Sequence, residues 1–64
     1  MSCYKIIYSK NGKRVGTEVF DDYDSALDSA LTKSRNDGYL CVVLAFNFKT
    51  AKWFKRCTVY PNVR

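Results

Sequence analysis

The sequence contains no histidine, three cysteines and a single proline among its 64 residues. Cys3, Cys41 and Cys57 are far apart and form no CxxC pair, whereas a structural zinc site needs about four ligands from Cys, His or carboxylate side chains. Nucleophilic catalysis requires a nucleophile beside a base, and we expect the three thiols in apolar strands, where thiolate formation is disfavoured. The sequence therefore predicts no metal site, no cofactor and no enzymatic activity.

Long apolar runs are also missing. No segment approaches the roughly 20 apolar residues that a membrane-spanning helix requires, and residues 1–5 lack the charged and then apolar pattern of a signal peptide. A chain this short buries only about 60% of the surface that its unfolded form exposes, which leaves no room for a deep catalytic cavity. We therefore expect one domain over residues 1–64, located in the cytoplasm and not attached to a membrane.

Two segments near the start of the chain alternate in the manner of β-strands. They cover residues 3–9 and 14–20, and both are rich in β-branched and aromatic residues. Asn11-Gly12 lies between them, and this dipeptide favours a type I′ turn because both central residues need positive φ. The sequence therefore predicts a first β-hairpin.

The hydrophobic period changes after the first hairpin. Asp22 is a suitable N-cap, because its carboxylate can accept hydrogen bonds from the first turn of a helix. Gly38 suits the left-handed residue that ends a helix. Between them, apolar residues recur at helical spacing and form one predicted buried stripe: Tyr23, Ala26, Leu27, Ala30 and Leu31. The alanines in this stripe would allow the helix to lie close to a sheet.

The segment at residues 39–46 carries no charged side chain. Alternation places one set of apolar residues on each face of this strand, Leu40, Val42, Leu44 and Phe46 on one and Tyr39, Cys41, Val43 and Ala45 on the other. Two apolar faces are typical of a strand that is covered on both sides. A single helix covers one face, so we expect the second face to meet a copy of itself, a partner or a ligand.

Residues 53–60 complete the pattern as a fourth strand. The predicted fold is α+β with the order ββαββ, in which a four-stranded antiparallel sheet carries one helix packed on one face. We predict the strand order 2-1-3-4, because it pairs the first and third strands and places these two apolar strands in the middle of the sheet.

Charge is distributed unevenly along the chain, whose net charge is +5. Residues 21–38 contain five aspartates against two cations, whereas residues 39–64 contain five lysines and arginines and no acid. The predicted helix layer is therefore acidic and the predicted sheet layer is basic.

The second predicted hairpin combines basic and aromatic residues, a composition typical of surfaces that bind single-stranded nucleic acid. Core packing of the aromatics and protection of an exposed sheet edge by the lysines explain the same residues without a ligand, and no RNP motif of the RRM type is present. The candidate binding residues are Phe48, Lys49, Lys52, Trp53, Lys55, Arg56 and Tyr60, together with Lys13 and Arg14 of the first hairpin.

Several short motifs follow one another in this chain. Tyr4-Lys5-Ile6-Ile7-Tyr8 begins a hairpin, Asp22-Tyr23-Asp24-Ser25-Ala26-Leu27 opens the helix, and an apolar strand and a basic aromatic hairpin complete the order. In size, charge and layout the chain resembles small early proteins of bacteriophages that disable host systems. Some anti-CRISPR inhibitors of type I surveillance complexes have a similar ββαββ layout, and the small phage inhibitor of bacterial RNA polymerase has a strand followed by a similar helix opening.

The resemblance implies a stoichiometric inhibitor in the cytoplasm of a host cell. It would bind a host protein or protein–nucleic-acid complex that handles nucleic acid, with the basic aromatic hairpin as the contact surface. Two other functions are consistent with the residues, a module that binds single-stranded nucleic acid directly and a structural homodimer joined through the open sheet face. The inhibitor predicts weak affinity for free nucleic acid, the nucleic-acid module predicts affinity that falls steeply with salt, and the homodimer predicts a stable dimer.

Overall fold

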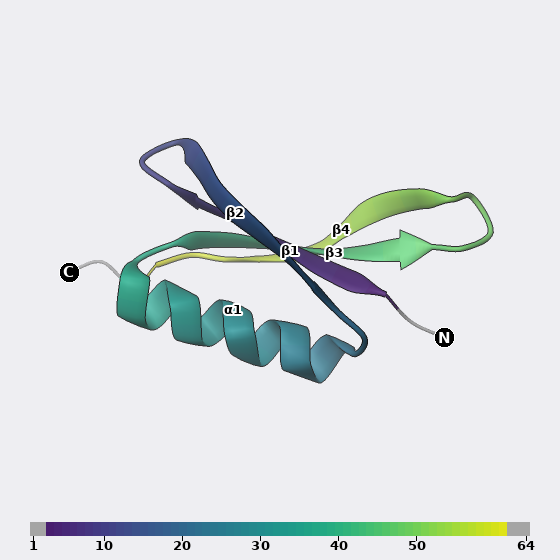
Figure 1. Cartoon of the computed structure of the whole chain (residues 1–64), viewed down its shortest axis with the longest axis horizontal. Coiled ribbons are helices and arrows are strands. Elements are labelled where there is room, and N and C mark those ends of the chain that lie inside the picture. Colours follow the sequence, from purple (N-terminus) through teal and green to yellow (C-terminus); the bar gives the residue numbers. More distant parts are fainter. Residues whose placement is uncertain (1–2, 62–64) are drawn as a thin grey trace.

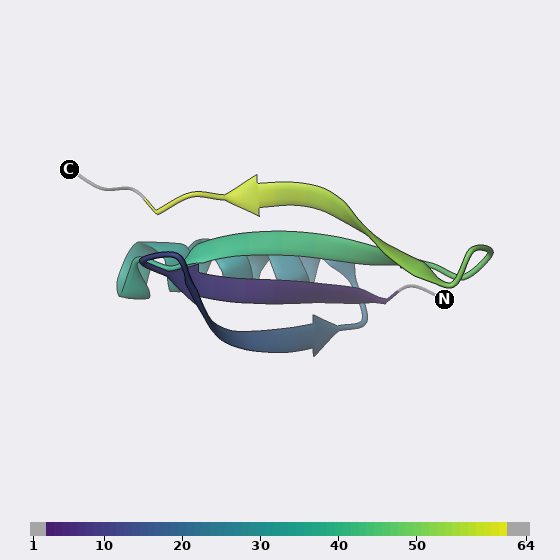
Figure 2. The ribbon, with the colours of Figure 1, turned by 90° about the horizontal axis from the view of Figure 1, so that it is seen from above.

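The computed structural model describes residues 3–61 and contains four strands and one helix. The elements are β1 (Tyr4–Lys10), β2 (Lys13–Phe20), α1 (Tyr23–Asp37), β3 (Leu40–Asn47) and β4 (Lys52–Val59). The strands pair antiparallel in the order β2-β1-β3-β4, and α1 lies across one face of the sheet (Figure 1 and Figure 2). The predicted α+β class, the ββαββ order and the strand order are confirmed, and the strand ends differ from the predicted ones by one residue.

The first hairpin closes as its turn residues predict. Asn11 and Gly12 have φ values of 53° and 79°, which is the positive pair that a type I′ turn requires. A β-bulge follows in β2, where Tyr8 lies opposite Gly16 but Ser9 lies opposite Arg14. Val15 is the extra residue, so Arg14 is on the opposite face of the sheet from Gly16.

The core lies between α1 and the sheet face that it covers. Ile6, Tyr8, Cys41 and Val43 are buried on this face, and the helix contributes buried residues from one row, Ala26, Ala30 and Ser34. These small side chains let the helix approach closely enough for the Cys41 Sγ to donate to the carbonyl oxygen of Ala30 at 3.4 Å. The helix therefore packs through its smallest residues.

The prediction that Leu31 belongs to the buried stripe is wrong. Leu31 is 45% exposed, because the helix contacts the sheet along the row of Ala26, Ala30 and Ser34 rather than along the bulkier side of the stripe. Leu31 lies beside this row, where it lines a shallow surface depression with Val59.

Both predicted helix caps are confirmed. The Asp22 carboxylate accepts a hydrogen bond from the backbone N–H of Ser25 at 3.0 Å. At the other end Gly38 has a φ of 71°, and its N–H donates to the carbonyl oxygen of Ser34 at 3.2 Å. The hydrogen bonds from the Ser25 side chain and backbone hold the pKa of the Asp22 carboxyl below its usual value.

Replacing Asp22 with alanine should lower the melting temperature by a few degrees at neutral pH. A depressed carboxyl pKa adds stability that is present above the unfolded-state pKa of about 3.9 and is lost as pH falls through the folded-state value. The difference between wild type and Asp22→Ala should therefore disappear in acid, as followed by circular dichroism melts. Asp37→Ala, at the negative end of the helix dipole, should not destabilise, and an equal loss in both variants would contradict the capping role.

Candidate binding surface

The sheet face opposite α1 is turned toward the viewer in Figure 2, with the helix behind the strands. We call it the open face. Cross-strand pairing and alternation place the following residues on it: Arg14, Thr17 and Val19 of β2; Lys5, Ile7 and Ser9 of β1; Leu40, Val42, Leu44 and Phe46 of β3; and Trp53, Lys55 and Thr58 of β4. The structure therefore shows which apolar face of β3 meets the helix. Cys41, Val43 and Ala45 are buried on the helix side, and the other set lies on the open face.

The open face is cationic. Lys5 and Lys55 lie on either side of Leu44 in one cross-strand row, and Arg14 lies opposite Ser9. Among the described residues of this face there is no acid. All six acidic residues of the chain lie elsewhere: Glu18 on the helix side of β2, Asp21 and Asp22 before the helix, and Asp24, Asp28 and Asp37 within it. An anionic partner would therefore meet attraction on this face and repulsion near the helix.

Residues 46–54 form the end of the β3–β4 hairpin, which we call the hairpin tip. It extends past the end of α1 (Figure 1). Phe46 packs edge-on against Phe48 at 4.9 Å and Trp53 at 5.1 Å between ring centroids. The Lys5 Nζ lies 4.4 Å from the Trp53 ring, a cation–π contact. Phe48 and Phe54 are 55% and 45% exposed, so the tip presents two large aromatic side chains to solvent.

The turn at the hairpin tip is held by its own side chains and backbone. The Asn47 Oδ1 accepts hydrogen bonds from the backbone N–H groups of Lys49 at 2.9 Å and Thr50 at 3.4 Å. Ala51 has a φ of 56°. This left-handed conformation costs a residue with a Cβ atom about 1–2 kcal/mol, because the Cβ comes too close to the following carbonyl oxygen. Backbone strain of this kind is enriched where a loop has a function.

The structure separates the predicted binding residues into two groups at opposite ends of the elongated sheet. Phe48, Lys49, Lys52 and Trp53 lie in the hairpin tip, and Lys55 lies beside it on the open face. Lys13, Arg14 and Tyr60 lie at the other end, near the β1–β2 turn. Arg56 is turned to the helix side, where its guanidinium carbon lies 4.9 Å from the Tyr23 ring centroid.

Sequence reasoning missed Lys5 and Leu44 as candidate binding residues. Lys5 comes from β1, far from the second hairpin in sequence, and reaches Trp53 only because β1 pairs with β3. The predicted strand order contained this signal, since it placed the first and third strands side by side. To predict that Lys5 lies opposite Leu44, the register of the two strands is needed as well as the strand order.

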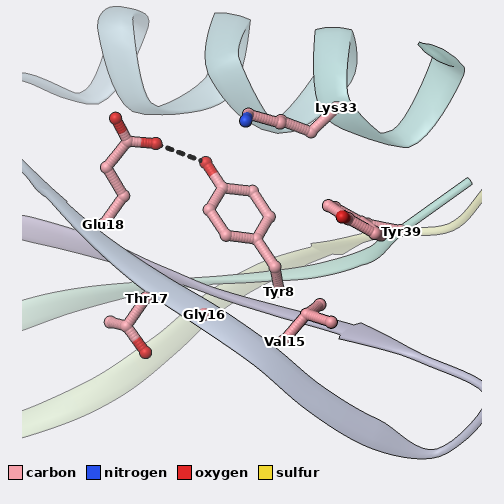
Figure 3. A pocket seen from close by; sticks show the side chains of 7 residues that line it. All are labelled: Tyr8, Val15, Gly16, Thr17, Glu18, Lys33 and Tyr39. Carbon is pink, nitrogen blue, oxygen red and sulfur yellow. Dashed lines mark hydrogen bonds between the residues drawn. The ribbon is translucent and has the colours of Figure 1, made fainter. Parts of the chain in front are cut away.

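A second depression lies on the helix side, between β2 and α1 (Figure 3). It is a shallow groove of about 330 Å³ lined by Tyr8, Val15, Gly16, Thr17, Glu18, Lys33 and Tyr39. The Tyr8 hydroxyl donates to the Glu18 Oε1 at 2.8 Å and lies 3.0 Å from the Ser29 Oγ. Burial raises the pKa of Tyr8 to about 12. These bonds tie β1, β2 and α1 together, and the phenol stays neutral at physiological pH.

The Cys41 thiol is not activated as a nucleophile. Burial raises the pKa of the Cys41 thiol, which disfavours the reactive thiolate. Cys57 lies on the helix side of β4, with its Sγ 3.5 Å from the Tyr23 hydroxyl. Within residues 3–61, no three or more Cys, Asp or Glu side chains are grouped so that they could hold a metal ion.

In the part of the chain that the structure describes, α1 is too short and too polar to cross a membrane.

Comparison with protein-family models, with curated proteins and with solved structures finds no match to this chain. The resemblance to small phage proteins therefore stays a prediction.

Proposed function

We propose that this chain is a non-catalytic binding protein that docks through the hairpin tip and the adjoining open face. Its target would be a host protein or protein–nucleic-acid complex that handles nucleic acid, and the docked protein would act as an inhibitor of the phage type. The observation that supports this function most directly is the projecting tip, which exposes Phe48 and Phe54 and carries Lys49 and Lys52. Lys52 and Phe54 lie on the face of β4 opposite to the open face, so the tip offers contacts on both of its sides.

The tip has the properties of an interface anchor. Aromatic side chains dominate the binding energy of many protein interfaces, and an ordered turn reduces the entropy lost on binding. The lysines around the tip and on the open face favour an acidic surface of the target, or nucleic acid bound to it, through charge complementarity. The role as an inhibitor itself comes from the resemblance in size, charge and layout.

The charge pattern disfavours the homodimer. A two-fold dimer brings the same patch of both copies together. Stacking two open faces would place Lys5 and Lys55 of one copy against the same cationic face of the other, with no acid on that face to offset the repulsion. A dimer through this face would therefore place like charges in a desolvated interface.

Direct binding of a single nucleic-acid strand is the second candidate. It is supported by Phe48, which is exposed and lies next to Lys49, because exposed rings stack on bases and lysines neutralise phosphate. Trp53 and Phe46 contribute less to such binding, since the Lys5 amine lies over the Trp53 ring and Phe46 packs against its two aromatic neighbours.

Charge reversal at the hairpin tip tests the proposed function. Lys49→Glu/Lys52→Glu should lose the bacterial complex that tagged wild-type protein retains from a lysate, because the tip would then repel an acidic target. The matched control is Lys10→Glu/Arg35→Glu, which changes the same number of cations at the end of β1 and in the last turn of α1, away from the tip. The control should retain the complex, and an equal loss in both variants would contradict docking through the tip.

A salt titration with labelled single-stranded and duplex DNA and RNA separates the two candidates. The inhibitor predicts weak binding of free oligonucleotides at physiological salt. Tight binding of single strands would identify the nucleic-acid module instead, if the logarithm of the binding constant falls with the logarithm of the salt concentration by about 0.7 per phosphate contacted.

A further inference from the structure

We propose that the open face receives an acidic amphipathic helix of the partner. This inference rests on the proposed function, because the same partner would also contact the hairpin tip. It adds the open face to the interface, beside the hairpin tip, and specifies the chemistry of the partner segment that packs there.

The centre of the open face is an aliphatic strip bordered by cations. Ile7, Val42 and Leu44 are half-buried neighbours on β1 and β3, and Lys5 and Lys55 lie on either side of Leu44. A helix that packs its apolar stripe on this strip would bring its flanking positions over the two lysines. Glutamate or aspartate at those flanks would form ion pairs, whereas lysine or arginine would be repelled.

A partner can contact the centre of this face only through its side chains, not through its backbone. β1 and β3 are the inner strands, and each is paired along both edges. Their backbone groups are therefore used within the sheet, and an added strand can pair only at β2 or β4. The opposite face of the same sheet accepts α1, a helix of 15 residues, which spans about 22 Å. A partner helix of similar length would cover the open face in the same way.

Two other occupants fit the face less well. Stacking of bases needs accessible ring faces, but the centre of the open face is aliphatic and the Lys5 amine lies over the Trp53 ring. A second copy through the same face would oppose lysines with lysines. The aliphatic strip with cations and without acids therefore selects an acidic, helical protein segment.

Trp53 supplies a direct probe, because it is the only tryptophan in the sequence and lies on the open face. The ligand is a synthetic peptide of about 15 residues, with leucine at helical spacing on one side and glutamate on the flanks. A peptide with lysine in place of glutamate tests charge, and a scrambled peptide of the same composition tests amphipathicity. The glutamate peptide should change Trp53 fluorescence saturably, and both control peptides should bind at least about tenfold more weakly. Equal binding of all three peptides would overturn the proposal.

Matched variants locate the peptide on the open face. Leu44→Glu should weaken peptide binding by about tenfold or more, whereas Leu31→Glu, the same change on the exposed side of α1, should leave it unchanged. Lys55→Glu and Arg35→Glu form a second pair that alters charge without placing an acid in the aliphatic strip, so the test stands if Leu44→Glu does not fold. Unchanged binding in folded Leu44→Glu or Lys55→Glu would overturn the proposal.

Failure of this inference can be told apart from failure of the proposed function. If the peptide does not bind but the wild type still retains its target through Lys49 and Lys52, docking through the tip stands and the helix proposal fails. If the peptide binds but charge reversal at the tip leaves target capture unchanged, the helix proposal stands and docking through the tip fails. If a single-stranded oligonucleotide competes with the peptide at equal concentration, the open face binds nucleic acid and the proposal of a partner helix is overturned.

Discussion

Replacing Ala30 with leucine should lower the free energy of unfolding by about 1–3 kcal/mol, the usual effect of overpacking a core. Ala30 is fully buried between α1 and the sheet, and its carbonyl oxygen accepts a hydrogen bond from the Cys41 thiol. The larger side chain would have to displace the helix from β3. Because a single core in a domain of this size rarely supplies more than about 3–5 kcal/mol, the variant should lose a large part of its stability.

Urea denaturation followed by far-UV circular dichroism measures this effect. Thr32→Leu is the matched control, because Thr32 is an exposed position of the same helix and leucine has the higher helix propensity. The control should be as stable as wild type or slightly more stable. Equal stability of Ala30→Leu and wild type would mean that α1 does not pack on the sheet through its alanine row.

Most of the fold could be predicted because turns and helix ends are determined by the residues at those positions and their close neighbours in the sequence. Asn11-Gly12 fixed the first turn through its positive φ values, and Asp22 and Gly38 marked the two ends of the helix. The strand order followed from the apolar character of the first and third strands, which are the inner strands of the sheet.

The rotation of the helix and the outward face of β3 could not be predicted in this way. Both faces of β3 are apolar, so alternation alone does not say which one meets α1. The helix stripe included Leu27 and Leu31, but close approach to the sheet favours the row of Ala26, Ala30 and Ser34. Such choices depend on packing between elements and not on the pattern within one of them.

The two β-bulges explain why the candidate site was only partly predicted. Regular alternation would place Lys55 and Cys57 on the same face of β4. The irregularity between Val43 and Leu44 makes Arg56 the extra residue, so Lys55 lies opposite Leu44 on the open face and Cys57 lies opposite Val43 on the helix side. The bulge at Val15 likewise moves Arg14 to the open face. The cationic character of this face therefore depends on irregularities that a period of two does not reveal.

The stability of the domain should fall between about pH 10 and pH 12, with Tyr8 as a main cause. Burial and the contact with Glu18 favour the neutral phenol and raise the pKa of Tyr8 to about 12, whereas an unperturbed tyrosine has a pKa of about 10. A raised pKa adds stability that is fully present below the unfolded-state value and is lost as pH rises through the folded-state value. At about 1.4 kcal/mol per pH unit, the loss from Tyr8 amounts to about 2–3 kcal/mol.

Tyr8→Phe separates this contribution from other alkaline effects. At pH 8 the variant should be less stable than wild type by about 1–3 kcal/mol, because Glu18 and Ser29 lose their hydrogen-bond partner. As pH rises toward 12, wild type should lose stability faster than the variant, so that the two curves of unfolding free energy converge. Hydrogen bonding to Cys57 also raises the pKa of Tyr23, and this contribution is common to both proteins.

Urea denaturation at a series of pH values from 8 to 12, with tyrosinate absorbance recorded in parallel, measures the convergence. Tyr60→Phe is the matched control, because Tyr60 is 73% exposed and lies outside the core. It should follow the wild-type curve throughout. Parallel curves for wild type and Tyr8→Phe would show that the Tyr8 hydroxyl does not hold β1, β2 and α1 together as the contacts with Glu18 and Ser29 indicate.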